Sequence, residues 1–223
     1  MSSASPGPIA VTVHRLGQGG ADRVAVLLAN GFQAAGFATD LIVFARGGKG
    51  EAALSALIHP AVRVVFLRGK HGSRLADHVR GFPSFVRYLR RERPRAVLSS
   101  GNNMNWVTTL GHLLARAGSA PLFLKLTNPI LRPKDRPLKR RYRRFVYGRV
   151  FARAAAILPL SVAEGCQVAA MFPAAVGKLR PVVNPYVTDA MLRLGDRNPT
   201  GAPSPASELI SIGRLQNQKN LGL

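Results

Sequence analysis

The sequence is short of cysteine, of acidic residues and of long hydrophobic runs. Cys166 is the only cysteine among 223 residues, so no disulfide framework is expected and a reducing compartment is the default. Residues 1–8 have neither the basic start nor the apolar stretch of a signal peptide. No apolar run approaches the roughly 20 residues that span a bilayer. We therefore expect a cytoplasmic protein that at most lies against a membrane surface.

The shortage of acidic residues leaves a large positive charge. Lysine and arginine number 32 against 10 aspartates and glutamates, which gives a net charge of +22 at pH 7. Such an excess predicts an anionic partner, namely lipid head groups, nucleotide phosphates or nucleic acid. A general preference for arginine, suggested by the usage of Ala, Arg, Gly and Pro, is the alternative explanation. Hydrophobic residues make up 47% of the chain, which argues against a disordered protein.

Common motifs for metals, nucleophiles and cofactors are also missing. The five histidines have no cysteine or acidic cluster beside them, so no metal site is expected. A Gly-x-Ser-x-Gly elbow, which would suggest a serine hydrolase, is absent. The turn that contains Gly17 and Gly19 has Asp22 in place of the third glycine of a dinucleotide-binding motif. No cofactor is expected.

Short apolar runs alternate with segments of helical periodicity. Strands are predicted at residues 9–13, 40–44, 62–67, 95–99, 121–126 and 179–183. Helices are predicted at residues 21–35, 75–91, 106–117 and 137–153, and a further one after Ser161. Nearly continuous apolar strands separated by helices predict an α/β fold, a doubly wound, Rossmann-like parallel sheet covered on both faces.

The composition changes after residue 194. Residues 195–206 are rich in proline, glycine and serine, and a new strand is predicted at 209–212. Gly213 then allows a tight turn, after which Arg214 and Lys219 can converge on one phosphate. The expected organisation has four parts: a disordered N terminus (1–8), a Rossmann-like domain (9–194), a linker (195–206) and the first strand and loop of a truncated second domain (207–223).

Glycine or polar residues follow three of the predicted strands. Gly19 and Gly20 lie between the first strand and the first helix, where helix amides can receive a phosphate. The same glycines would also serve a tight turn without a ligand. Polar pairs follow the fourth and fifth strands at the ligand-facing edge: Asn102 with Asn103, and Thr127 with Asn128. They are candidate sugar contacts or simple helix-entry residues.

Cations are most concentrated between residues 132 and 153, where Asp135 is the only acid. The candidate membrane-facing residues are Lys139, Arg140, Arg141, Arg143 and Arg144. A basic helix with interleaved aromatic residues can lie on an anionic leaflet. Alternatively, its aromatic stripe belongs to the core and its arginines are solvated. RNA binding is the least favoured explanation, because no RNP, KH or zinc signature accompanies the charge.

Five motifs occur in a definite order. They are Gly19-Gly20-Ala21-Asp22-Arg23-Val24 with the following Leu28-Ala29-Asn30 segment, Gly36-Phe37, Arg93-Pro94, Ser161-Val-Ala-Glu164, and Gly213-Arg214-Leu215 with Lys219-Asn220. In these motifs the chain resembles the retaining glycosyltransferases of family 4, which have the GT-B architecture. The resemblance covers residue 9 to the end of the sequence.

This resemblance implies two Rossmann-like domains that face a cleft. The first would hold the sugar acceptor, for which Asn102, Asn103, Thr127 and Asn128 are the candidates. The second would hold the nucleotide sugar, which is a substrate and not a cofactor. Carried over by position, Arg214 and Lys219, with the turn at Gly19 and Gly20, would bind the donor diphosphate. Fixed cations there would stabilise the charge that develops on the departing phosphate.

The chain departs from the family pattern at two places. The Glu-x7-Glu motif of the donor domain would lie beyond Leu223, and no histidine follows the fifth strand. The expected function is transfer of a sugar from a nucleotide-sugar donor to a glycan or lipid-linked acceptor at the cytoplasmic membrane face. This chain alone is expected to be inactive as an incomplete enzyme. The alternative is a non-catalytic basic module that binds an anionic membrane or RNA.

Overall fold

The computed structural model describes residues 7–69, 72–117, 120–131, 136–186 and 192–193. The chain divides into two units, Met1–Tyr186 and Val187–Leu223. All of the helices and strands described below belong to the first unit. The predicted linker and the predicted start of a second domain lie outside the described residues, and so does most of the predicted N-terminal segment.

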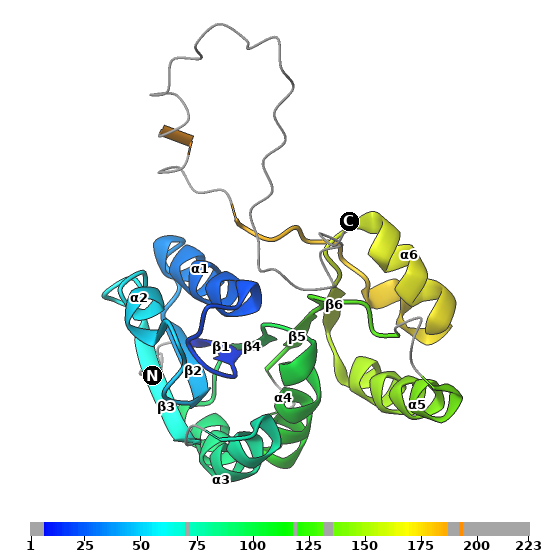
Figure 1. The fold of residues 1–223 in the computed structure, drawn as a ribbon, viewed down its shortest axis with the longest axis horizontal. Coiled ribbons are helices and arrows are strands. Elements are labelled where there is room, and N and C mark those ends of the chain that lie inside the picture. The colour runs from blue at the N-terminus through cyan, green and yellow to red at the C-terminus, as the bar shows by residue number, and fades with distance from the viewer. Residues whose placement is uncertain (1–6, 70–71, 118–119, 132–135, 187–191, 194–223) are drawn as a thin grey trace, which may run out of the picture. The chain divides into compact units, whose positions relative to one another are not determined.

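A six-stranded sheet with the order β3-β2-β1-β4-β5-β6 forms the centre of the first unit (Figure 1). Its strands are β1 (Ile9–Val13), β2 (Thr39–Ala45), β3 (Arg63–Gly69), β4 (Ala96–Ser99), β5 (Leu122–Lys125) and β6 (Ala156–Leu158). Every pair of neighbouring strands is parallel. The doubly wound, Rossmann-like α/β fold predicted from the sequence is confirmed.

Helices cover both faces of this sheet (Figure 1). On one face lie α1 (Gly20–Ala34) and α2 (Glu51–Ser55), and on the other lie α3 (Arg74–Glu92), α4 (Asn102–Leu114) and α5 (Pro137–Arg153). After β6 come α6 (Val162–Met171) and a 3₁₀ helix (Pro173–Lys178). The two faces have separate cores because side chains alternate along each strand. In β2, for example, Leu41 packs in the core of α1 and α2, whereas Phe44 packs against α3.

Four elements differ from the predicted ones, and the first is β6, which was not among the predicted strands. The five-residue α2 is too short to show a helical period in the sequence. The predicted strand at 179–183 is wrong: Leu179 makes only an isolated bridge to Ile157. The amides of Arg180 and Val182 donate to the carbonyls of Ile157 and Pro159, each at 2.8 Å, so this segment runs beside β6 without forming a regular strand. Finally, α4 begins at Asn102 and not at residue 106.

The capping box predicted at the start of α6 is present, but the Glu164 side chain bonds to a different backbone amide from the one expected. The Ser161 hydroxyl accepts a hydrogen bond from the Glu164 amide at 3.1 Å, as a capping box requires. The Glu164 carboxylate accepts from the amide of Leu160 at 2.6 Å, one residue before the cap. The capped start of α6 is therefore fixed to the end of β6 from both directions.

Gly111 of α4 packs closely against α3. A Cβ atom at this position would lie 2.5 Å from Cε1 of Phe85, which is fully buried. We expect Gly111→Ala to lower the free energy of unfolding by about 1–3 kcal/mol through overpacking. Gly148 in α5 is the control, because its Cβ would meet nothing within 4 Å. Gly148→Ala should raise the free energy of unfolding by about 0.5–1 kcal/mol, since alanine favours a helix.

Denaturant unfolding of both variants tests this packing argument. Shifts of opposite sign are expected at the two positions. A gain in stability for Gly111→Ala would show that α3 and α4 are not as closely packed as the structure indicates.

Candidate functional site

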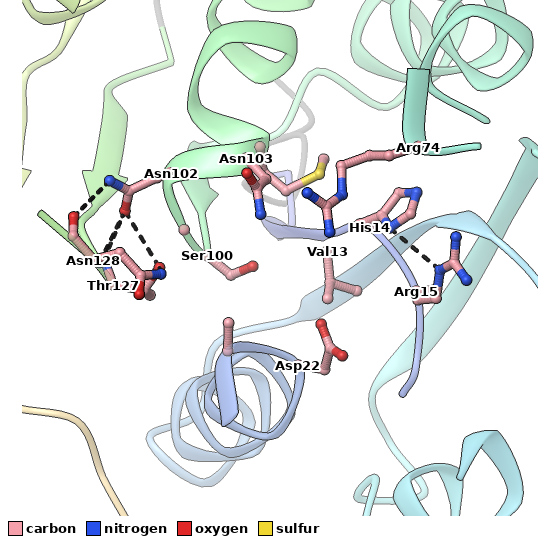
Figure 2. Close-up of a pocket in the computed structure, with 13 residues that line it drawn as sticks. Val13, His14, Arg15, Asp22, Arg74, Ser100, Asn102, Asn103, Thr127 and Asn128 are labelled. Carbon is pink, nitrogen blue, oxygen red and sulfur yellow. Dashed lines mark hydrogen bonds between the residues drawn. The ribbon is translucent and has the colours of Figure 1, made fainter. Parts of the chain in front are cut away.

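A cavity of about 360 Å³ opens at the carboxyl edge of the sheet, beside β1 and β4. The strand that follows β1 in the chain, β2, lies on one side of this pair in the sheet, and the strand that follows β4, β5, lies on the opposite side. Doubly wound sheets bind ligands at such a switch point. The segments that follow β1, β4 and β5, together with the first turns of α1 and α3, form its walls (Figure 2).

The structure brings the four sequence-predicted acceptor candidates together at this cavity. Asn102 and Asn103 begin α4, and Thr127 and Asn128 follow β5; all four line the cavity. They come from separate segments because β4 and β5 are neighbours in the sheet and their carboxyl ends meet. Their function as sugar contacts stays a prediction.

Asn102 holds the turn after β5 in place. Its Oδ1 accepts from the backbone amides of Thr127 at 2.7 Å and Asn128 at 3.3 Å. Its Nδ2 donates to the carbonyl of Asn128 at 2.8 Å. Because the amide is engaged at both ends (Figure 2), Asn102 is suited to position the cavity wall more than to contact a ligand. The side chain of Asn103 extends toward the cavity and keeps its hydrogen-bonding capacity.

The opposite wall contains side chains that sequence reasoning missed, among them His14, Arg15 and Arg74. Behind them lies Asp77, which is fully buried. Its Oδ2 accepts from Arg15 Nη2 at 3.1 Å and lies 3.3 Å from Nε2 of His14. His14 and Arg15 directly follow a predicted strand on the ligand-binding edge. Their place directly after this strand could have identified them as candidate site residues.

The electrostatics of this wall keep His14 neutral. Burial lowers the pKa of His14 to about 4, the positive charges of Arg15 and Arg74 act in the same direction, and Asp77 opposes them. Nδ1 of the imidazole accepts from Nε of Arg15 at 3.3 Å. With one nitrogen turned to Arg15 and the other to Asp77, the ring is a fixed polar part of the cavity wall.

The glycine turn before α1 is shaped by Asp22. A Cβ at Gly17 or Gly19 would come within 3.0 or 2.9 Å of Oδ2 of Asp22, so a larger residue at either position would have to displace this carboxylate. Asp22 also lines the cavity, whereas Gly19 and Gly20 line a separate hollow of about 220 Å³ beside α2. The predicted contact of these two glycines with a donor diphosphate stays a prediction.

Asp22 is expected to make stability depend on pH. Burial raises its pKa from 3.8 to about 6, although the hydrogen bond from Gly19 and the positive charge of Arg15 both lower the pKa. The folded state therefore binds more protons than the unfolded state between pH 4 and 6, so this contribution to stability falls as pH rises through that window. Asp22→Asn should raise the free energy of unfolding by about 1–2 kcal/mol at pH 7 and change it little at pH 4.

Denaturant titrations of the Asp22→Asn variant and the unmodified chain at pH 4, 5, 6 and 7 measure this difference. A difference in stability that is the same at every pH would contradict the pKa shift.

A family model for the glycosyl transferase 4-like domain matches residues 19–186 of the chain. The chain belongs to this family. The resemblance predicted from the sequence motifs is thereby confirmed. The matched range begins at Gly19, which precedes α1, and ends at Tyr186, the last residue of the first unit. None of the curated proteins compared with the chain matches it.

Solved structures share the fold of this glycosyl transferase 4-like domain. Anabaena Alr3699/HepE, crystallised with UDP and glucose, matches with a TM-score of 0.57 and 15% identity over 85% of this chain and 50% of that chain. The lipopolysaccharide outer core galactosyltransferase WaaB matches with a TM-score of 0.54 and 15% identity over 79% of this chain and 45% of that chain. The UDP-GlcNAc 2-epimerase of Methanocaldococcus jannaschii matches with a TM-score of 0.56 and 10% identity over 79% of this chain and 45% of that chain.

At these identities the similarity shows the fold, which is that of a GT-B domain. The chain spans about half the length of each of these structures. Within the part of the chain that the structure describes, no cluster of His, Cys, Asp and Glu could hold a metal. Arg214 and Lys219, the other predicted donor contacts, lie outside the described residues.

The predicted membrane-facing residues of this family member all lie on α5. Lys139, Arg140, Arg141 and Arg144 are exposed, whereas Arg143 is half-buried and donates from Nη1 to the carbonyl of Ile130 at 3.0 Å. The aromatic residues of α5 are divided between two faces: Tyr147 and Phe151 pack in the core, while Tyr142 and Phe145 are exposed. None of the helices in the described ranges could cross a bilayer.

Proposed function

We propose that the chain forms the acceptor-side half of a glycosyltransferase, which transfers a sugar from a nucleotide-sugar donor to a glycan or lipid-linked acceptor. One observation carries this proposal: the four predicted acceptor residues meet at the switch-point cavity of a glycosyl transferase 4-like domain. Amides and hydroxyls both donate and accept hydrogen bonds, which suits the hydroxyl groups of a sugar.

The geometry suggests a division of labour within the cavity. Asn103 contacts an acceptor hydroxyl, while Asn102 holds Thr127 and Asn128 in the correct position. The wall of His14 and Arg15 limits the space on the other side. Because Nδ1 of His14 accepts from Arg15 and Nε2 faces Asp77, this imidazole shapes the cavity wall and does not take a proton from the substrate.

The donor side of the proposal rests on the family and on a solved relative. Anabaena HepE was crystallised with UDP and glucose, which supports a nucleotide sugar as the donor here. Arg214 and Lys219 would neutralise the diphosphate as the glycosidic bond breaks, because fixed cations stabilise that developing charge. The turn at Gly19 and Gly20 would approach the same diphosphate. Retention of anomeric configuration is expected from the family resemblance.

Transfer also needs a donor-binding half. The solved structures with this fold are about twice as long as the chain, so we expect negligible activity from these 223 residues alone. The experiment compares this chain with a polypeptide that continues through a second, donor-binding domain. Both are given radiolabelled nucleotide sugars and a total lipid and glycan extract. Equal incorporation of label by the two polypeptides would defeat this part of the proposal.

The exposed cations of α5 favour one competing function, a non-catalytic module that binds an anionic membrane or RNA. Its location would then be peripheral, at the inner face of the membrane. Co-sedimentation with RNA over a range of salt concentrations separates the two functions. Strong RNA binding with a steep salt dependence, and no effect of nucleotide sugars, would favour the module over the enzyme.

A further inference from the structure

The helix α5 has an apolar ridge that faces away from the core. The ridge consists of Leu138, Tyr142 and Phe145, which are 80%, 66% and 60% exposed. Their spacing of four and three residues places them on one side of the helix. Val150 and Phe151 on another side are almost completely buried. The ridge is therefore additional to the apolar surface that α5 needs for folding.

Cations border this ridge on both sides. Arg149 lies in line with it, Arg141 lies on one side and Lys139 on the other, and Arg144 lies farther around the helix; all four are exposed. The guanidinium of Arg149 lies 4.8 Å from the centre of the Phe145 ring. The helix contains no acidic residue. Long arginine side chains can place their stems along apolar material while the charge reaches a polar surface.

Other helices have only part of this combination. In α3, exposed Leu75 and Val79 are accompanied by arginines, but the helix also contains Asp77 and Glu92. In α4, Leu110, Leu113 and Leu114 are exposed, but the helix has no lysine or arginine. In α1 and α2 together, the single cation Arg23 is accompanied by Asp22 and Glu51. The positive charge and the exposed apolar groups thus coincide on α5 with no acid to balance them.

We propose that α5 lies flat on an anionic lipid leaflet. The ridge enters the boundary between head groups and acyl chains, and the bordering cations contact lipid phosphates. The apolar ridge favours a lipid surface over nucleic acid, because phosphate contacts alone need no exposed leucine. The absence of acids from α5 removes the repulsion that an anionic surface would otherwise exert on the helix.

Docking through α5 would also orient the cavity. On the inner side of the helix, the hydroxyl of Tyr147 donates to the backbone carbonyl of Asn102 at 3.2 Å. Nη1 of Arg143 donates to the carbonyl of Ile130 at 3.0 Å. The docking helix is therefore attached to the wall that contains the acceptor candidates, so a lipid-linked acceptor would approach the cavity from the same leaflet. Only this consequence rests on the proposed transferase function.

Vesicle co-sedimentation tests the docking without any sugar transfer. The full 223-residue chain should sediment with vesicles of phosphatidylcholine and phosphatidylglycerol in a 2:1 ratio, and not with phosphatidylcholine alone. About 1 M NaCl should weaken the binding strongly, because salt screens surface charges. The charge variant Arg141→Gln/Arg144→Gln/Arg149→Gln should bind the anionic vesicles about 100-fold more weakly. The ridge variant Leu138→Ser/Tyr142→Ser/Phe145→Ser should bind at least about tenfold more weakly.

The matched control removes exposed leucines from a helix without cations. Leu110→Ser/Leu113→Ser/Leu114→Ser on α4 should leave vesicle binding unchanged. The proposal would be overturned by an equal loss of vesicle binding in this control, by unchanged vesicle binding in the ridge variant, or by the absence of a preference for anionic vesicles. Competition by RNA that is equal for the unmodified chain and the ridge variant would also overturn it, in favour of a general polyanion surface.

Amide hydrogen exchange of the unmodified chain provides a measurement that needs no variant. Anionic vesicles should slow exchange over residues 138–149 and leave the amides of α1 unaffected. Protection confined to any other helix would place the docking surface elsewhere and contradict the assignment to α5.

Discussion

Asn102→Ala is expected to reduce sugar transfer about 100-fold in a polypeptide that carries both halves. The variant loses the amide that holds Thr127 and Asn128 through four hydrogen bonds of 2.7 to 3.3 Å. The turn after β5 would then be free to move away from the start of α4. A displacement of about 1 Å in a positioning group can cost this factor in rate. The measurement is kcat/KM for transfer from a radiolabelled nucleotide sugar.

Asn30→Ala is the control for this experiment. Asn30 likewise joins a helix to a loop, with Nδ2 donating to the Leu57 carbonyl at 2.7 Å and Oδ1 accepting from the His59 amide at 2.8 Å. It does not line the cavity. Both variants should lose a similar, small amount of stability, but only Asn102→Ala should lose transfer. Equal activity of the two variants would show that the turn after β5 is not part of the site.

Asp40→Ala is expected to lower the free energy of unfolding by about 3 kcal/mol. Asp40 is 3% exposed and accepts from the Tyr88 hydroxyl at 2.6 Å and from Nε of Arg63 at 2.8 Å. Burial raises the pKa of Tyr88, and the bond to Asp40 raises it further. Removal of the carboxylate would leave the buried hydroxyl without its acceptor. Arg63 is half-exposed, so water can replace part of the hydrogen bonding that its guanidinium loses with the carboxylate.

Urea unfolding measures this loss, and Asp40→Asn is the comparison, since it keeps an oxygen acceptor and should cost less. Asp40 is the second residue of β2, whereas the cavity lies at the carboxyl ends of the strands. Transfer per folded molecule should therefore be unchanged. A loss below about 1 kcal/mol in Asp40→Ala would mean that the network is not important for stability.

The sequence was sufficient for β1 to β5 and for one wall of the cavity. These strands are short apolar runs, and buried parallel strands need no alternation, so their positions could be predicted. The three-residue β6 was not predicted, because so short a run gives too weak a pattern. Asn102, Asn103, Thr127 and Asn128 were identified because parallel strands bring their carboxyl ends to one edge. Their division into a positioning amide and a free amide depends on hydrogen bonds between two segments. No pattern in the sequence specifies those bonds.

On the second wall, His14 and Arg15 could have been identified in the same way, but Arg74 could not. Arg74 reaches the cavity from the start of α3, and this depends on the path of the chain from β3. In α5 the sequence left two explanations for the aromatic residues open. The structure divides the aromatic residues: Phe151 packs against the sheet, and Phe145 faces solvent, while contact with a leaflet stays a prediction. A helical period alone cannot distinguish two apolar sides until the position of the sheet is known.

The most direct test of the acceptor site is to fill the cavity. Ala21 is half-buried and lines it, so Ala21→Trp would place a large side chain where the acceptor is proposed to bind. In a polypeptide with both halves, transfer should fall at least about 100-fold while binding of the nucleotide alone is unchanged. Transfer by Ala21→Trp at the rate of the unmodified enzyme would contradict the assignment of this cavity to the acceptor.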